Sequence, residues 1–145
     1  TINEEVTVID QNLNTSEFAH FDVKQILTPK DIVRLHGEVK NIFMSDEIKR
    51  YAVQIMDATR TPDKYALEFG KYIEVGCGPR ATIALVQAAK AEAMMNGRDF
   101  VTPHDVKEVA YDVLRHRLNI NYLGQAKNIG GDKIIQEILL KVPLP

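Results

Sequence analysis

The sequence predicts an all-α protein, a bundle of about five or six helices. Apolar residues recur every three or four positions along most of the 145-residue chain, which is the period of an amphipathic helix. Threonine precedes proline at Thr28-Pro29 and Thr102-Pro103, a pattern typical of the first turn of a helix. The candidates for extended structure are short, namely residues 72–75 and a loop or hairpin within residues 119–131.

The first half of the chain contains three predicted helices. Residues 1–12 are expected to form a short helix, and residues 17–27 an irregular connection. Thr28-Pro29-Lys30-Asp31 predicts a helix start, because a capping threonine is followed three residues later by an acid. Ser45 caps the next helix, whose apolar stripe has the spacing i, i+3, i+4, i+7, i+8: Ile48, Tyr51, Ala52, Ile55 and Met56.

The most apolar helix follows the segment Gly76-Cys77-Gly78-Pro79-Arg80-Ala81. Gly78 is the expected N-cap and Pro79 the first helical residue, which places Arg80 in the first turn. The helix is apolar on almost all sides as far as Asn96-Gly97, so we expect neighbours to bury it from several directions.

Arg80 is an unusual residue for the start of a helix. The N-terminus already carries a positive partial charge, so a cation there is unfavourable by roughly 0.3 kcal/mol or more. A nearby phosphate would compensate, because backbone N–H groups and a guanidinium together bind this anion well. Alternatively, Arg80 is solvated or pairs with a carboxylate elsewhere in the fold, and the residues leave these alternatives open.

Two further helices complete the bundle. One of them begins at Thr102-Pro103-His104-Asp105 and ends at Arg115-His116-Arg117, where the helix dipole favours cations. Residues 119–131 are rich in Asn and Gly, and they predict the loop or hairpin. Asp132 is expected to cap a final helix that runs to Leu140.

Composition limits the function classes. The formal net charge of −2 gives no broad attraction to nucleic acid or to acidic membranes. No apolar run approaches the roughly 18 residues of a membrane span, and we expect no signal peptide. The single cysteine, Cys77, excludes an internal disulfide, favours a cytoplasmic location and is expected to be a packing residue. The four histidines are scattered, so no metal site is expected, and the chain contains no phosphate loop.

Three motifs occur in the order and spacing of the C-terminal lid of MoxR-type AAA+ ATPases. They are Gly76-Cys77-Gly78-Pro79-Arg80-Ala81, Gly97-Arg98-Asp99-Phe100-Val101-Thr102-Pro103-His104-Asp105-Val106 and Val113-Leu114-Arg115-His116-Arg117. The resemblance covers about residues 28–145 and implies that they form a helical, AAA+ lid-like domain. Residues 1–27 would then be a linking helix and connection from an ATPase core outside this chain. Gly78 replaces the usual Ser of the family, which puts in doubt the angle at which the helix presents Arg80.

The resemblance also implies a function. Arg80 resembles the sensor-2 arginine, which reaches from the lid to nucleotide phosphates in the core, and Gly78 and Pro79 are the residues that present it. ATP and Mg²⁺ would bind to the full-length protein and none to this chain alone. Hydrolysis in a ring oligomer would drive chaperone-like remodelling or maturation of partner complexes, with von Willebrand A-domain proteins among the implied partners and neither nucleic acid nor a membrane. The family pattern leaves open whether a further set of residues is structural or contacts a neighbouring subunit: Arg98, Asp99, Arg115, His116 and Arg117.

Two other functions fit the same helices. A stand-alone helical protein-interaction module would use an exposed apolar groove and would not need Arg80. A histone-like DNA binder is disfavoured, because the net charge is acidic and the sequence has no basic stripe. Whichever function holds, the chain alone is expected to lack ATPase activity, because it lacks a phosphate loop.

Overall fold

The computed structural model describes the backbone of residues 1–12 and 24–145. The predicted irregular connection at residues 17–27 therefore lies mostly outside the described residues. The chain divides into two units, Thr1–Arg34 and Leu35–Pro145. The first unit contains α1, and the boundary between the units falls within α2.

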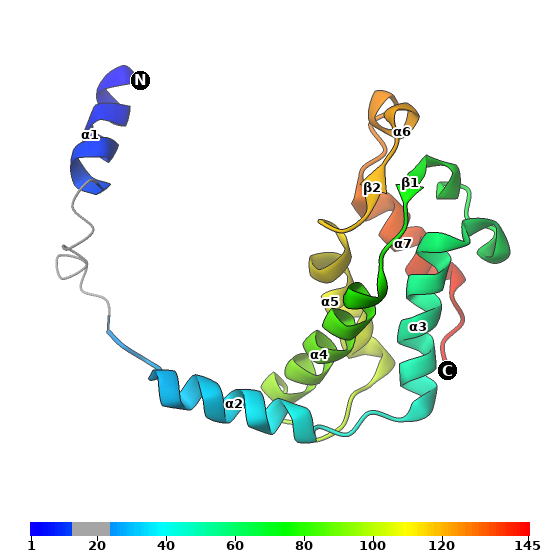
Figure 1. Ribbon diagram of the computed structural model, residues 1–145, viewed down its shortest axis with the longest axis horizontal. Coiled ribbons are helices and arrows are strands. Elements are labelled where there is room, and N and C mark those ends of the chain that lie inside the picture. The colour runs from blue at the N-terminus through cyan, green and yellow to red at the C-terminus, as the bar shows by residue number, and fades with distance from the viewer. Residues whose placement is uncertain (13–23) are drawn as a thin grey trace. The chain divides into compact units, whose positions relative to one another are not determined.

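Seven α-helices, two 3-10 turns and two short strands make up the described residues, which confirms the predicted all-α class (Figure 1). In chain order they are α1 (Ile2–Asn12), α2 (Pro29–Asn41), α3 (Asp46–Arg60), η2 (Pro62–Tyr65), η3 (Gly70–Tyr72), β1 (Ile73–Val75), α4 (Pro79–Met95), α5 (Pro103–Leu114), β2 (Asn119–Ile120), α6 (Tyr122–Ala126) and α7 (Gly131–Lys141). None of the helices in these described ranges is long and apolar enough to cross a membrane.

The core of the second unit lies among four helices. α4 packs against α5 and α3, and α7 packs against the same two helices (Figure 1). The predicted apolar stripe of α3 is confirmed, because all of its members are buried: Ile48, Tyr51, Ala52, Ile55 and Met56. The apolar face of α7 is buried as well: Ile134, Ile135, Ile138 and Leu139. The predicted cap of α3 is confirmed as well, since the Ser45 hydroxyl accepts the Ile48 N–H at 3.3 Å.

Residues 119–131 were predicted as a loop or hairpin, and they do not form a hairpin of their own. This segment instead contributes one strand, β2, which pairs antiparallel with the distant β1 through Ile120 and Ile73, and then forms the short helix α6. The final helix also begins differently, because Gly130 is its N-cap and Asp132 lies inside the first turn. Local composition predicted a break at these positions, whereas the partners of the segment lie far away in the sequence.

The loop before β1 is held by α7. The Glu137 carboxylate accepts two successive backbone N–H groups, from Glu68 at 2.6 Å and from Phe69 at 2.9 Å. A carboxylate that accepts two backbone donors forms charge-assisted hydrogen bonds, which are stronger than neutral ones. The entry to β1 is therefore attached to the last helix of the chain.

The expectation that α4 is buried on almost all sides is wrong. Only one face is buried, and it carries three alanines and one leucine: Ala81, Leu85, Ala89 and Ala93. Alanine at three of these four positions lets α5 and α3 approach this face closely. Ile83 is 58% exposed, and Met95 is 73% exposed, so the opposite face of α4 remains open.

Candidate functional site

The N-terminus of α4 has the predicted local geometry. Gly78 is the N-cap in an extended conformation, with φ −77° and ψ 174°, and Pro79 is the first helical residue. The Ala81 N–H donates to the Gly78 carbonyl at 2.9 Å, which closes the first turn through the backbone. Glycine offers no oxygen for capping, and within the described residues no side chain caps this helix end.

Arg80 extends from this uncapped end into solvent. Its side chain is exposed, and none of the residues that the structure describes forms a hydrogen bond or ion pair with its guanidinium. Of the alternatives for Arg80, pairing with a carboxylate is therefore not observed in this part of the chain. An exposed cation beside free helix N–H groups can accept an external anion.

The turn that precedes Arg80 is held by the last two residues of α3. The Cys77 N–H donates to the Thr59 hydroxyl oxygen at 2.9 Å, and that hydroxyl donates to the Met56 carbonyl at 2.7 Å. Arg60 Nε donates to the Cys77 carbonyl at 2.7 Å. Thr59 and Arg60 were not predicted to hold this turn, because they lie 18 and 17 residues before Cys77 and carry no local motif.

The two glycines of this turn have different roles. A Cβ added at Gly76 would lie 2.4 Å from the Thr59 carbonyl oxygen, so the chain can approach α3 only with glycine here. A Cβ added at Gly78 would meet nothing within 4 Å. The close approach of the turn to Thr59 therefore requires glycine at position 76, whereas position 78 has room for a larger side chain.

Cys77 is a packing residue, as predicted. It is a free cysteine and only 1% exposed. Burial raises the pKa of its thiol, and this effect outweighs the Thr59 hydrogen bond and the Arg117 and Arg60 charges, which lower it. Its thiol is therefore less reactive than an ordinary cysteine at neutral pH.

Arg98 is a structural residue rather than a free cation. Its Nη1 and Nη2 groups donate to the two carboxylate oxygens of Asp105 at 2.7 and 2.6 Å. Asp105 is only 1% exposed, and it also accepts the N–H and hydroxyl of Thr102 at 2.7 and 2.8 Å. The Arg98 hydrogen bonds, helped by those of Thr102, lower the pKa of Asp105 from 3.8 to about 2.

The basic end of α5 also has partners within the chain. Arg115 Nε donates to Asp132 at 2.7 Å, which connects α5 to the start of α7. Arg117 Nη1 donates to the Val113 carbonyl at 2.5 Å. His116 and Asp99 are exposed. These contacts give Arg115 and Arg117 structural roles in this chain.

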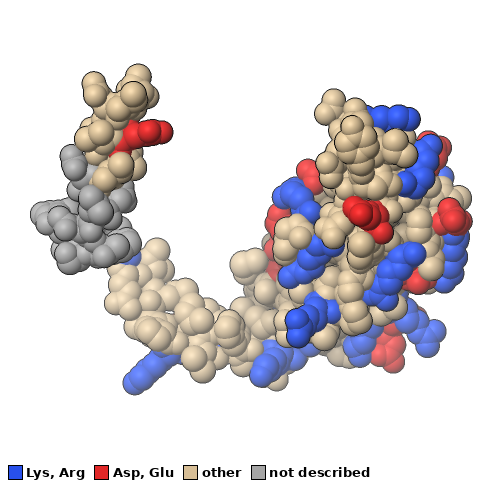
Figure 2. Space-filling view, turned by 45° about the horizontal axis from the view of Figure 1, so that its top comes forward, with Lys and Arg blue, Asp and Glu red and all other residues tan. Residues whose placement is uncertain are grey.

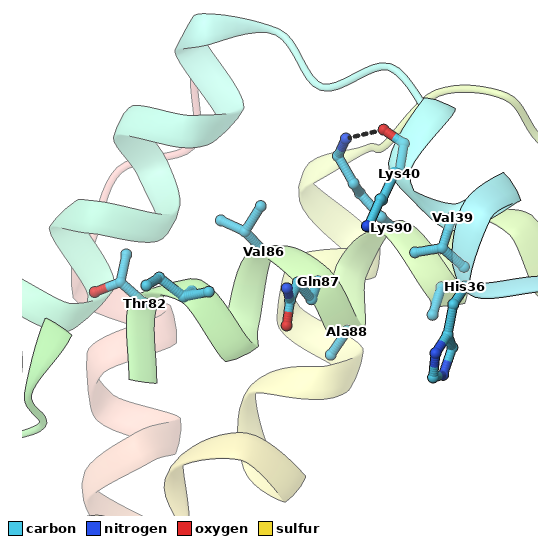
Figure 3. A pocket seen from close by; sticks show the side chains of 10 residues that line it. His36, Val39, Lys40, Thr82, Val86, Gln87, Ala88 and Lys90 are labelled. Atoms are coloured by element: carbon cyan, nitrogen blue, oxygen red, sulfur yellow. Dashed lines mark hydrogen bonds between the residues drawn. The ribbon is translucent and has the colours of Figure 1, made fainter. Parts of the chain in front are cut away.

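An apolar groove lies between the C-terminal half of α2 and the open face of α4 (Figure 3). It has a volume of about 850 Å³. Half of its lining residues are apolar, three are basic and none is acidic: His36, Val39, Lys40, Thr82, Ile83, Val86, Gln87, Ala88, Lys90 and Ala91. Lys90 Nζ donates to the Lys40 carbonyl at 3.0 Å, which joins the two walls.

The visible surface of the second unit has mixed charge. Lys and Arg side chains are interspersed with Asp and Glu on the face that Figure 2 shows. This arrangement differs from the continuous basic stripe typical of nucleic-acid-binding surfaces. Among the described residues, no group of three His, Cys, Asp or Glu side chains could hold a metal ion.

Comparison with known proteins gives consistent matches. Residues 67–138 match the family model of the AAA lid domain. The chaperone MoxR1 of Mycobacterium tuberculosis is 38% identical over 123 residues, which cover 84% of this chain and 33% of that protein. The uncharacterized protein YeaC of Bacillus subtilis is 30% identical over 145 residues, which cover 100% of this chain and 42% of that protein.

A solved structure has a similar fold. The crystal structure of a candidate ATPase from Cytophaga hutchinsonii aligns with a TM-score of 0.81 and 36% identity, over 99% of this chain and 43% of that one. The chain thus spans less than half of the length of each of these relatives.

Proposed function

Because this chain belongs to the MoxR-type AAA+ ATPases and carries their AAA lid domain, we propose that Arg80 contacts the phosphates of a nucleotide bound in a separate core domain. Residues 28–145 act as the lid, and residues 1–27 link it to that core. The relatives are more than twice as long as this chain, which leaves ample length for a core.

The observation that carries the proposal is the free guanidinium of Arg80. Four other arginines of this unit bind to their own chain: Arg60, Arg98, Arg115 and Arg117. Arg80 has no such partner among the described residues, although its position at a helix N-terminus disfavours a cation. A phosphate would supply the missing negative charge and would also interact favourably with the free N–H groups of the helix end.

The proposed mechanism uses this charge in the transition state. ATP and Mg²⁺ occupy the core domain, and Arg80 pairs with phosphate oxygens as negative charge develops on them. Loss of the γ-phosphate removes the partner of Arg80 and weakens the attachment of the lid to the core. Hydrolysis is thereby converted into a rotation of the lid, because the two states differ in this contact.

The wider role follows from the family. We propose that the full-length protein assembles into a ring with neighbouring subunits in the cytoplasm. It would remodel or mature partner complexes in the manner of a chaperone, with von Willebrand A-domain proteins among its partners. The relative named chaperone MoxR1 supports this part of the proposal.

Measurement of ATP hydrolysis by the full-length protein tests the role of Arg80. We expect Arg80→Ala to lower kcat about a hundredfold, because loss of one transition-state charge contact costs about 3 kcal/mol. Arg50→Ala is the matched control, since Arg50 is also exposed and forms no hydrogen bond within the described residues. Nucleotide binding and ring assembly are followed in parallel, and unchanged hydrolysis in Arg80→Ala would refute the proposal.

A second candidate function is supported by the groove between α2 and α4. Its apolar lining and volume of about 850 Å³ fit a protein-interaction module that does not contact nucleotide. This alternative predicts that Arg80→Ala hydrolyses ATP like the wild type. The same experiment therefore separates the two functions.

A further inference from the structure

We propose that Arg60 is a positioning residue for Arg80. Its Nε–H bond to the Cys77 carbonyl, together with the Thr59 bond to the same residue, orients the turn from which α4 presents its arginine. This inference rests on the proposed contact between Arg80 and nucleotide phosphate. It adds that α3 determines where that contact is made.

The local sequence does not fix the direction of this helix start. Gly78 has no side chain to cap α4, and its φ and ψ angles are accessible to many residues. A helix end without a side-chain cap is free to fray or tilt unless other contacts hold it. These contacts are made at Cys77, the residue before the N-cap, with the end of α3.

Cys77 is held through both of its backbone polar groups. Its N–H donates to the Thr59 hydroxyl, and its carbonyl accepts from Arg60 Nε, at 2.9 and 2.7 Å. The Thr59 hydroxyl in turn donates to the Met56 carbonyl, so the turn is connected to the backbone of α3. Two consecutive residues at the end of α3 thus hold the two peptide groups that flank Cys77, three residues before Arg80.

Steric contact reinforces the hydrogen bonds. The absence of a Cβ at Gly76 allows the turn to approach the Thr59 carbonyl, where a Cβ would lie at 2.4 Å. Thr59 is 1% exposed, and α3 carries seven buried residues, so this anchor is part of the core. A movement of the end of α3 must therefore move the turn and the start of α4 with it.

Arg60 is the member of this anchor that can be replaced with the least damage to the core. Its side chain is exposed, so a substitution leaves no cavity. Arg60→Met keeps a long, flexible side chain and removes the Nε–H donor to the Cys77 carbonyl. Arg50→Met is the matched control, because it makes the same substitution at an exposed arginine of α3 that does not contact the turn.

A double-mutant cycle in the full-length protein tests whether Arg60 acts through Arg80. We expect Arg60→Met to lower kcat for ATP hydrolysis about tenfold with little change in KM, since a misplaced contact costs mainly transition-state stabilisation. Arg80→Ala should lower kcat about a hundredfold. The double variant should match Arg80→Ala rather than fall about a thousandfold, because residues that act through one contact are not additive.

Each outcome of the cycle has a distinct meaning. If Arg60→Met and Arg50→Met have the same kcat, or if the two losses multiply in the double variant, Arg60 does not position Arg80. If Arg80→Ala is fully active, the proposed function itself fails. The inference and the function it rests on are thus tested separately.

A second readout does not depend on catalysis. Cys77 is buried within the turn, so its rate of alkylation by iodoacetamide reports how firmly the turn is held. Peptide mapping by mass spectrometry should show faster labelling of Cys77 in Arg60→Met than in Arg50→Met, with the two variants equal in melting temperature. Equal labelling rates would overturn the inference.

Discussion

The starts of α4 and α5 resemble each other in sequence and differ in chemistry. Both have proline at the first helical position and an arginine close by. At α5 the arginine, Arg98, is paired with the buried Asp105, and the cap residue Thr102 donates to the same carboxylate. At α4 the cap is glycine and Arg80 is exposed without a partner among the described residues.

This difference separates a structural arginine from a candidate functional one. The charges at the start of α5 are satisfied within the chain, so that site stabilises the fold and has no capacity left for a ligand. At the start of α4 the charge and the N–H groups are unsatisfied, so that site contributes little to the stability of the chain and can bind an anion. Proximity to a helix N-terminus alone would not have distinguished the two arginines.

The largest expected effect is on stability at the α5 start. Arg98→Met leaves the Asp105 carboxylate buried without its cation, and it should lower the free energy of unfolding by about 3 kcal/mol. Arg80→Met should change it by less than about 0.5 kcal/mol, as is usual for an exposed residue. Urea unfolding at pH 7, followed by circular dichroism, measures both. Equal losses would contradict the contrast between the two arginines.

The pH dependence of stability sharpens the same contrast. The pKa of Asp105 is about 2 in the folded protein, against 3.8 as its ordinary value. Because the pKa of Asp105 is lower in the folded protein than in the unfolded chain, its carboxylate stabilises the fold above about pH 4. This stabilisation is lost as the pH falls toward 2. The shift corresponds to about 2 kcal/mol.

Unfolding free energies measured between pH 2 and 6 provide the check. Asp105→Asn should lack this part of the acid-induced loss, and Arg80→Met should retain all of it. The difference in unfolding free energy between Asp105→Asn and the wild type gives the contribution of Asp105 apart from the other carboxylates. Parallel curves for Asp105→Asn and the wild type would contradict the assignment.

The two glycines before α4 provide the next comparison. Gly76→Ala places a Cβ against the Thr59 carbonyl and should cost between about 1 and 2 kcal/mol of stability. Gly78→Ala meets no atom and should cost less than about 1 kcal/mol, the difference between these residues at an N-cap. Thermal unfolding of the two variants ranks them, and an equal or reversed order would refute the close approach at Gly76.

The smallest expected effect concerns a buried group without a partner. The Tyr51 hydroxyl is buried and forms no hydrogen bond with any described residue, in contrast to the fully bonded Asp105. Burial also raises the pKa of Tyr51. Tyr51→Phe should therefore leave stability unchanged or increase it by up to about 1 kcal/mol. A loss of more than that in urea unfolding would show that the hydroxyl has a partner.

Much of the fold could be predicted because it depends on patterns within a few neighbouring residues. The stripe from Ile48 to Met56 and the cap at Ser45 follow from helical spacing and side-chain chemistry over a few residues, and the structure confirms them. The N-cap at Gly78 and the first turn at Pro79 are confirmed for the same reason. The placement of Arg80 in that turn is a direct consequence.

The errors concern partners that are distant in the sequence. Composition at residues 119–131 indicated a break in helix, but it carries no information that β2 pairs with β1. The apolar sequence of α4 predicted burial on almost all sides, but the number of helices that pack against α4 depends on the arrangement of the whole bundle. The contacts of Thr59 and Arg60 with the turn were missed for the same reason, because ordinary α3 residues acquire this role only in the folded state.

The attachment of the β1 entry to Glu137 has a consequence for synthesis on the ribosome. Glu137 follows Phe69 by 68 residues, and β2 also follows β1 at long range. At about 5–20 residues per second, the loop before β1 waits for several seconds before α7 emerges and supplies Glu137. Nascent chains that stop before α7 should therefore contain Arg80 and its anchor on α3, and yet lack the carboxylate that holds the loop before β1.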